Sequence, residues 1–259
     1  MIPIPIKYLK IIIYKIYMSL REKKSSFKVI PPKSGLNADL GDNIDEALSQ
    51  RNFTAIIAGR PSSGKSSLMD FLLADKRGYN KVYDKVYLIS PGSSLKCFDN
   101  SVWEDHPEDQ IYDRIDIDVM FSLTKLLEET RDDEKNSLVV MDDIQADLKK
   151  AGVERQLMKW FSNYRHLRTS FVILAQNVIM IPRQVRLLAD YYFVFVPTHS
   201  KEYEIIREEI LSFLSRQQVK EVVDLVYDEP YNFLLVNKKN KQLYKNFNEL
   251  EGDHAGGVV

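Results

Sequence analysis

The sequence predicts an α/β fold, in which helices cover both faces of a mainly parallel sheet. Several short segments rich in β-branched and aromatic residues are apolar throughout rather than alternately polar, as in strands that are buried on both faces. Segments with the apolar spacing of helices separate these strands along the chain. A loop rich in glycine and serine follows the first strand and precedes the first helix of the series. This alternation predicts a doubly wound sheet.

The predicted elements of the core follow one another in a regular order. A short helix is expected first, at residues 43–50. Strands are expected at residues 53–58, 86–89, 138–141, 171–175 and 191–196. Helices are expected at residues 65–73, 120–131, 155–168 and 183–189. One helix therefore lies between each pair of consecutive strands, which is the connection that parallel strands require.

The C-terminal part of the chain has a different pattern. Helices are expected at residues 201–211 and 215–227, and the second begins with a Ser-x-x-Gln capping box at Ser215 and Gln218. Strands at residues 232–236 and 242–247 flank a polar turn and predict a hairpin. The expected organisation is an N-terminal tail and linker (1–40), a core (41–200), a C-terminal extension of helices and a hairpin (201–250), and a flexible tail (251–259).

The N-terminal tail is apolar but carries Lys7, Lys10 and Lys15. These charges exclude a transmembrane run, and the lack of a small-residue cleavage motif argues against a secretory signal. One interpretation of residues 1–17 is a basic amphipathic segment that contacts a membrane surface. The other is that translation starts at Met18, so that residues 1–17 are not translated.

Composition limits the classes of function. The 259 residues include 36 basic and 37 acidic side chains, so no net field draws the chain to nucleic acid and any DNA-binding surface has to be local. The single cysteine excludes an internal disulfide and a cysteine-based zinc site, in agreement with a reducing compartment. The four histidines lack the spacing of metal ligands.

The loop after the first strand has the sequence GRPSSGKS and fits the pattern G-x-x-x-x-G-K-S. Its backbone N–H groups and the positive end of the next helix are expected to bind the phosphates of a nucleoside triphosphate. Lys65 is expected to reach the β- and γ-phosphates, and the Ser66 hydroxyl to ligate Mg²⁺. The expected nucleotide-binding residues are Gly59, Arg60, Pro61, Ser62, Ser63, Gly64, Lys65, Ser66 and Ser67. The flanking strand and helix favour this interpretation over a serine-rich turn that caps an ordinary helix.

Two adjacent acids follow the strand expected at residues 138–141. Asp142 is the expected second ligand of Mg²⁺, and Asp143 is expected to act as general base for the attacking water. Adjacent acids also occur as ordinary surface-turn residues, so their weight depends on the phosphate loop. The separation of Lys65 from Asp142 leaves room for an additional strand, which favours ATPases over most GTPases and nucleoside kinases. The chain has no Asn-Lys-x-Asp motif for guanine.

The strand expected at residues 171–175 ends at two amides. Gln176 is expected to lie beside the γ-phosphate, where an amide donates to a phosphate oxygen and accepts from water. We therefore predict that Gln176 is a sensor of hydrolysis. An amide that only ends a strand in a turn is the alternative.

Arg165 and Arg168 precede the same strand. Either one could reach the γ-phosphate of a neighbouring subunit as an arginine finger, because a planar guanidinium stabilises charge on the transferring phosphoryl oxygens. The alternative is that these arginines solvate a helix end or contact DNA.

Four segments, in this order and spacing, are similar to the motifs of the viral DNA-packaging ATPases of the FtsK-HerA superfamily: GRPSSGKS, SLVVMDDIQ, NYRHLRTS and FVILAQN. This family includes the packaging ATPases of poxviruses, giant viruses, virophages and polinton-like elements. The resemblance covers about residues 50–200. It is most specific at the aspartate pair and at Arg165, His166, Ser170 and Gln176.

The resemblance implies a RecA-like P-loop NTPase core that hydrolyses ATP with Mg²⁺ in a DNA-stimulated reaction. It further implies a ring of five or six copies, translocation of double-stranded DNA into a preformed capsid, and capsid or portal proteins as partners. The implied compartments are the host cytoplasm, in its virus factories, and the virion. Two residues depart from the broader superfamily: Asp143 stands where glutamate is usual, as in the viral branch, and Arg60 adds an unusual charge to the phosphate loop.

DNA contact is expected in a pore lined by basic residues from the region 149–168. Lys149 and Lys150 follow the acidic pair and are expected to bind DNA phosphates without sequence preference and in a salt-sensitive way. Two other functions stay open at this point. A cellular-type DNA translocase or helicase has the same core, generally with extra domains. A nucleotide-gated adaptor would bind ATP with little turnover, and Asp143 in place of glutamate gives that alternative some support.

Overall fold

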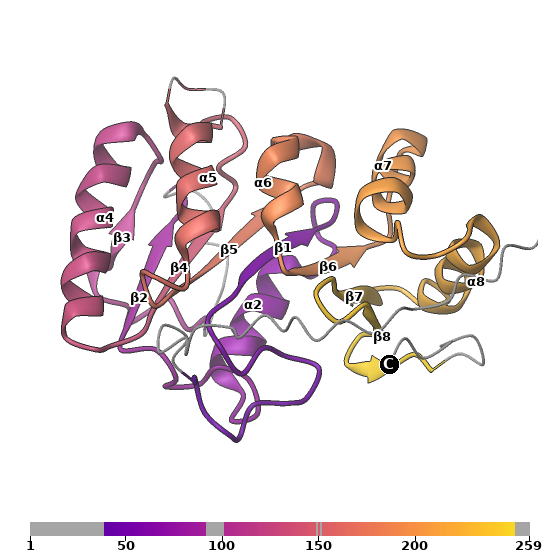
Figure 1. Cartoon of the computed structure of the whole chain (residues 1–259), viewed down its shortest axis with the longest axis horizontal. Coiled ribbons are helices and arrows are strands. Elements are labelled where there is room, and N and C mark those ends of the chain that lie inside the picture. The colour runs from indigo at the N-terminus through magenta and orange to yellow at the C-terminus, as the bar shows by residue number, and fades with distance from the viewer. Residues whose placement is uncertain (1–38, 92–100, 149, 151, 252–259) are drawn as a thin grey trace, which may run out of the picture. The chain divides into compact units, whose positions relative to one another are not determined.

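A nine-stranded sheet forms the core of the protein (Figure 1). The computed structural model describes residues 39–91, 101–148, 150 and 152–251. The strands are β1 (Thr54–Ala58), β2 (Lys85–Ile89), β3 (Ile111–Tyr112), β4 (Ser137–Asp142), β5 (Thr169–Ala175), β6 (Tyr191–Phe195), β7 (Phe233–Asn237), β8 (Gln242–Lys245) and β9 (Asn248–Glu249). Their order across the sheet is β3-β2-β4-β5-β1-β6-β7-β8-β9.

The six strands from β3 to β6 in this order run parallel to one another. The predicted mainly parallel sheet is therefore confirmed. Strands β7, β8 and β9 continue the same sheet in antiparallel pairing, so the C-terminal hairpin extends the sheet of the core. The C-terminal ends of the six parallel strands lie along one side of the sheet, and this side is the edge meant below. The loops that follow these strands therefore meet there, on either side of the central strand β1.

Helices cover both faces of the sheet, as predicted. They are α2 (Lys65–Ala74), α4 (Ile117–Asp132), α5 (Val153–Asn163), α6 (Arg183–Leu188), α7 (Ser200–Ile205) and α8 (Arg216–Val226), with the one-turn helices η1 (Glu108–Gln110) and η2 (Val178–Met180) and the π-helix η3 (Ile206–Ile210). Helices α4, α5 and α6 lie side by side on one face, where η3 and α8 also pack, and α2 lies on the other (Figure 1).

The core strands are apolar throughout because both of their faces are buried. In β1, Ile56 and Ala58 face the core beneath α4 and α5, whereas Ala55 and Ile57 face the core beneath α2. All four side chains are fully buried. The apolar pattern in the sequence is continuous because the sheet lies between two helical layers.

Aromatic packing fixes α5 on the sheet. Trp160 and Phe161 stack on Phe171 of β5, with ring centroids 5.2 Å and 6.1 Å apart. The indole Nε1 of Trp160 donates to the hydroxyl of Thr124 in α4 at 2.9 Å. The polar atom of this buried ring therefore has a partner, and the same bond ties α5 to α4.

Residues 43–50 do not form the predicted helix but a series of turns. The N–H group of Ala47 bonds to Asp45 Oδ1 at 3.1 Å, and that of Ser49 bonds to the Tyr79 hydroxyl at 3.1 Å. These side-chain acceptors replace the backbone acceptors of a helix.

The helix predicted at residues 155–168 also differs, because α5 begins at Val153 and ends at Asn163. Arg165 and Arg168 therefore lie in the turn before β5, where Arg168 has a left-handed backbone with φ 48°.

The C-terminal helices match the prediction more closely. The capping box of α8 is present: the N–H of Ser215 donates to Gln218 Oε1 at 2.9 Å, and the N–H of Gln218 donates to Ser215 Oγ at 3.3 Å. The helix predicted at residues 201–211 is α7, which continues as the π-helix η3.

The predictions for residues 1–17, for most of the linker and for residues 252–259 lie outside the described residues. Among the helices that the structure describes, none is long and apolar enough to cross a membrane.

Candidate nucleotide-binding site

The phosphate loop connects β1 to α2 at the edge of the sheet where the parallel strands end. A Cβ atom at Gly59 would lie 2.7 Å from Cβ of Phe195 and 2.6 Å from Oγ of Ser63. Both distances are too short for a carbon atom, so the start of the loop requires glycine. Gly64 ends the loop with φ 101° as the N-cap of α2, without a side-chain cap. The N–H groups of the first turn of α2 are therefore free to bind an anion.

The middle of the loop contains a buried polar atom without a partner. The hydroxyl of Ser63 is buried and makes no hydrogen bond within the described part of the chain. Buried hydroxyl groups are nearly always hydrogen-bonded, so this atom fits a ligand oxygen in the loop. Arg60, Pro61 and Ser62 are exposed, and Ser62 has a left-handed backbone with φ 61°.

Lys65 folds back over the loop. Its Nζ atom donates to the carbonyl oxygen of Gly59 at 2.7 Å and to that of Arg60 at 3.1 Å. Burial lowers the pKa of Lys65, and the charges of Asp142 and Asp143 act in the opposite direction. The lysine and the acidic pair are therefore close enough to interact electrostatically.

Asp142 and Asp143 leave β4 at the same edge of the sheet. Burial raises the pKa of Asp142, Lys65 opposes this rise, and Asp143 adds to it. A cation next to such a carboxyl group favours its ionised form. Asp143 is exposed, has a left-handed backbone with φ 54°, and accepts from Gln145 Nε2 at 2.7 Å.

The register of the sheet places Gln176 between the loop and the acidic pair. Asp142 is the partner of Leu174 across β4 and β5. On the other side of β5, the N–H of Gly59 donates to the carbonyl oxygen of Ala175 at 3.1 Å. Gln176 follows directly and is exposed at this edge. Its role as a sensor stays a prediction.

The oxygen atoms at this edge fit Mg²⁺. This ion takes hard oxygen ligands and is commonly held by one or two protein groups together with substrate phosphates. Ser66 in the first turn of α2 and Asp142 at the end of β4 lie at this edge, and Ser66 acts against the rise in the pKa of Asp142. Within the described ranges no cluster of three or more His, Cys, Asp or Glu residues is suited to a metal ion. One hydroxyl and one carboxylate suit an ion that arrives with a nucleotide, and the roles of Ser66 and Asp142 stay predictions.

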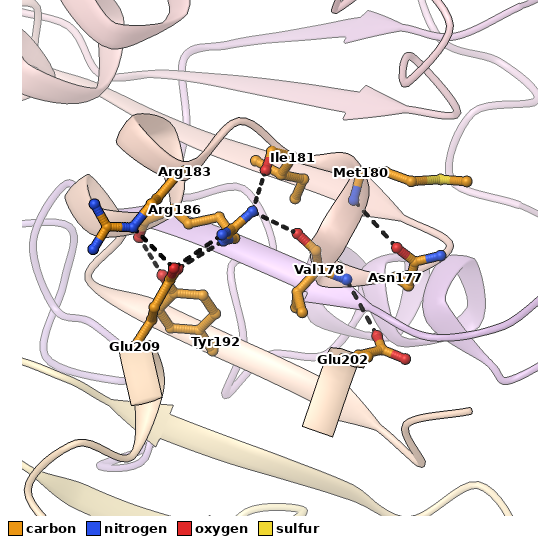
Figure 2. A network of polar contacts seen from close by, with 9 residues as sticks. All are labelled: Asn177, Val178, Met180, Ile181, Arg183, Arg186, Tyr192, Glu202 and Glu209. Carbon is orange, nitrogen blue, oxygen red and sulfur yellow. Dashed lines mark hydrogen bonds and ion pairs between the residues drawn. The ribbon is translucent and has the colours of Figure 1, made fainter. Parts of the chain in front are cut away.

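A buried charge network supports the segment that follows β5 (Figure 2). The guanidinium group of Arg186 in α6 donates to both carboxylate oxygens of Glu209, at 2.9 Å and 3.1 Å. It also donates to the carbonyl oxygens of Val178 at 3.3 Å and Ile181 at 2.5 Å. Arg183 is a second partner of Glu209 at 3.1 Å. Burial acts to raise the pKa of Glu209, but the two arginines keep it below its ordinary value.

Glu202 in α7 holds the same segment from another side (Figure 2). Its carboxylate accepts from the N–H of Val178 at 3.2 Å and from that of Thr198 at 3.1 Å, and the residue is only 2% exposed. The side chain of Asn177 caps η2. The backbone next to Gln176 is therefore fixed by groups from α6, α7 and η3, as a precisely placed amide requires.

Arg165 and Arg168 lie at the opposite edge of the sheet. Both precede β5, whose seven residues run from these arginines toward the phosphate loop. At about 3.3 Å per residue this strand spans about 20 Å. Nε of Arg165 donates to the Tyr164 hydroxyl at 2.9 Å, and Nε of Arg168 is buried without a partner among the described residues. Neither arginine reaches the phosphate loop of its own chain, so a finger role requires a second copy.

The two lysines proposed for DNA contact follow β4. Lys150 forms an ion pair with Asp147 at 2.8 Å, which offsets part of its charge. Lys149 lies outside the described residues. Contact with DNA stays a prediction for both.

Sequence reasoning did not identify Phe195, Arg186 or Glu202. The apolar run that contains Phe195 predicted a strand. It did not predict that the Phe195 side chain packs against Gly59, the first residue of the phosphate loop. Arg186 and Glu202 lie in short helices of mixed polarity, and no spacing in the sequence indicates that either side chain is buried. Their burial follows only from the packing of α6 and α7 on the sheet.

Comparisons with known proteins agree with this geometry. The model of the poxvirus A32 protein family matches residues 43–239. Among solved structures, B204, the DNA-packaging ATPase of Sulfolobus turreted icosahedral virus, is 19% identical with a TM-score of 0.56, over 75% of this chain and 96% of that one. The genome packaging NTPase B204 of Sulfolobus turreted icosahedral virus 2, in complex with ATP-gammaS, is 19% identical with a TM-score of 0.55, over 76% and 98%. Curated protein sequences give no match. The resemblance inferred from the sequence is confirmed.

Proposed function

This chain belongs to the poxvirus A32 protein family, and from that premise we propose that it is an ATP-hydrolysing motor that moves double-stranded viral DNA into a preformed capsid. The packaging function named for the structural neighbours supports the proposal. The observation that carries it is the convergence of Lys65, Ser66 and the pair Asp142 and Asp143 at one edge of the sheet.

Each group at this edge has a role in the proposed reaction. The backbone N–H groups at the start of α2 bind the phosphates, and Lys65 exchanges its loop carbonyl partners for β- and γ-phosphate oxygens. Mg²⁺ held by Ser66 and Asp142 would offset negative charge on the phosphates. Water attacks the γ-phosphorus, its proton passes to Asp143, and the bond to the bridging oxygen of ADP breaks. Gln176 donates to the γ-phosphate.

The two candidate finger arginines imply that the motor works as an oligomer. Arg165 and Arg168 lie at the edge opposite the phosphate loop of their own chain, so the proposal requires a ring in which they reach the loop of the adjacent copy. We assign Arg168 or Arg165 as a finger in trans, in a ring of five or six subunits. Basic residues of the region 149–168, including Lys150, face DNA phosphates in the pore. Capsid or portal proteins are the further partners, in virus factories of the cytoplasm or in the virion.

The first test is the variant Lys65→Ala, with Lys76→Ala as the matched control. Lys76 is an exposed lysine shortly after the same helix. We expect Lys65→Ala to lose ATP hydrolysis and DNA packaging together, because the main charge on the β- and γ-phosphates is gone, and Lys76→Ala to keep both. Undiminished hydrolysis in Lys65→Ala contradicts the proposal.

Two further measurements separate the proposal from its alternatives. Turnover with and without double-stranded DNA tests for an adaptor, which binds ATP but does not respond to DNA. Strand displacement without capsids tests for a helicase. The proposal predicts DNA-stimulated turnover and no strand displacement.

A further inference from the structure

ATP in the phosphate loop has a defined direction along the sheet. In the proposed reaction its γ-phosphate lies beside Asp142, the last residue of β4, and Gln176, which follows β5. The order of strands in this part of the sheet is β4-β5-β1-β6-β7, and the loop follows β1. The nucleoside therefore extends away from β4, toward the end of β6 and the beginning of β7.

An aromatic residue stands beside the loop on that side. Phe195 at the end of β6 pairs with Phe233 at the start of β7, with ring centroids 5.4 Å apart. A Cβ atom at Gly64 would lie 3.6 Å from the Phe195 ring and 3.8 Å from Cδ1 of Tyr231. The Tyr231 ring thus lies next to the residue that precedes Lys65, in the segment that enters β7.

Packing does not account for the position of Tyr231. The residue is 71% exposed, so its ring adds little to the core. Its backbone is left-handed with φ 66°, a conformation that costs free energy in a bulky aromatic residue. Strain of this kind persists where the surrounding structure imposes it, and it concentrates at functional sites.

Polar bonds impose the position of Tyr231. Asn232 Nδ2 donates to Asp228 Oδ1 at 2.9 Å, and Asn246 Nδ2 donates to Asn232 Oδ1 at 2.9 Å. Lys245 Nζ donates to both carboxylate oxygens of Asp228 at 2.6 Å. Asp228 and Asn232 are therefore tied to Lys245 of β8 and to Asn246 in the turn after it, so the backbone that carries the exposed ring is held in place before any ligand arrives.

We propose that Tyr231 stacks on the base of the nucleotide bound by the phosphate loop. This inference rests on the proposed function, because it needs a triphosphate in that loop. An exposed, pre-positioned ring offers a flat apolar surface to a base, and such stacking is tolerant of base identity. Tyr231 therefore contributes affinity for the nucleoside and little discrimination between purines.

The test compares ligands with and without a base. Binding of ATP and of inorganic tripolyphosphate is measured by calorimetry, with Mg²⁺, on the full chain and on Tyr231→Ala, Tyr231→Phe and the control Phe121→Ala. Phe121 is an exposed aromatic residue on α4. We expect Tyr231→Ala to weaken ATP binding about tenfold to hundredfold and to leave tripolyphosphate binding unchanged. Tyr231→Phe and Phe121→Ala keep the affinity of the parent chain for ATP.

Two results overturn the inference and leave the phosphate site standing. One is unchanged ATP affinity in Tyr231→Ala, and the other is an equal loss of ATP and tripolyphosphate binding, which indicates damage to the loop. If the parent chain binds neither ligand, or if Lys65→Ala binds both as the parent does, the proposed function itself fails and the inference with it.

Discussion

The buried ion pair between Arg186 and Glu209 can be tested by the change Arg186→Met. The exposed fraction of the two side chains is 7% for Arg186 and 13% for Glu209. The change removes four hydrogen bonds of the guanidinium group and leaves Glu209 with Arg183 alone, whose side chain is 65% exposed. It keeps the aliphatic part of the side chain, so the lost contacts are mainly polar.

The expected loss of stability in Arg186→Met follows from the buried charge that the change leaves with one partner fewer. Breaking a buried ion pair by removing one partner costs about 3–5 kcal/mol. Because Arg183 still contacts Glu209, we expect the lower end, about 3 kcal/mol. In the double variant Arg186→Met with Glu209→Met neither charge of the buried pair remains. Only the carbonyl groups of Val178 and Ile181 lose a donor, so the double variant should cost about 1–2 kcal/mol, less than the single change.

Urea unfolding followed by circular dichroism measures these free energies. The pH dependence gives an independent check. The folded-state pKa of Glu209 is held below its ordinary value, so its contribution to stability is present above the unfolded-state pKa and is lost as pH falls through the folded-state pKa. The cost of Arg186→Met should therefore be smaller at about pH 4 than at about pH 7. Equal destabilisation by the single and double variants, or a cost of Arg186→Met below about 1 kcal/mol, refutes this reasoning.

Three further predictions concern the loop, the metal site and the extension. Gly59→Ala should destabilise the fold by about 1–3 kcal/mol and weaken ATP binding, because its Cβ would overlap Phe195; parent values in urea unfolding and ATP titration would contradict this. Ser215→Ala should cost about 1 kcal/mol of stability through loss of the α8 cap and leave ATP affinity unchanged, which the same two assays measure. Burial raises the pKa of Asp142, so protons compete with Mg²⁺ for this carboxylate as pH falls. The Mg²⁺ affinity of the ADP complex should therefore decrease more steeply with falling pH in the parent chain than in Asp142→Asn, whose side chain does not titrate; an equal pH dependence in the two chains would contradict this.

The core was predictable because its signals are continuous and local. The strand at residues 138–141 and the helix at residues 65–73 needed only apolar runs and a phosphate-loop pattern, and both were found within a residue or two of their observed ends. The capping box at Ser215 specifies a helix start through its own hydrogen bonds, independent of tertiary context.

The errors arise where tertiary contacts override a local pattern. Ile44, Ala47 and Leu48 have helical spacing and are indeed buried, but bonds to distant groups replace the helix in this short segment. Leu167 prolongs the apolar pattern of α5 past its end because it too is buried, in the turn before β5. The two-residue strand β3 is too short to leave any pattern.

The candidate site divides in the same way. Lys65, Ser66 and Asp142 could be identified as candidates from sequence motifs, because phosphate and metal binding require those residue types at those positions. Glu202 and Tyr231 could not be identified in this way, because neither belongs to a motif. Glu202 matters through its bond to the backbone of Val178, and Tyr231 through its position next to Gly64. Only the packing of the C-terminal extension on the sheet brings them to the phosphate edge.

The most direct test of the shared magnesium site is a double-mutant cycle of Ser66→Ala and Asp142→Ala. The measured quantity is the Mg²⁺ affinity of the ADP complex in the parent chain, the two single variants and the double variant. If the hydroxyl and the carboxylate hold one ion, each single change weakens binding and the second change adds much less than it costs alone. Losses that simply add would show that the two residues act at separate places, contrary to the site described here.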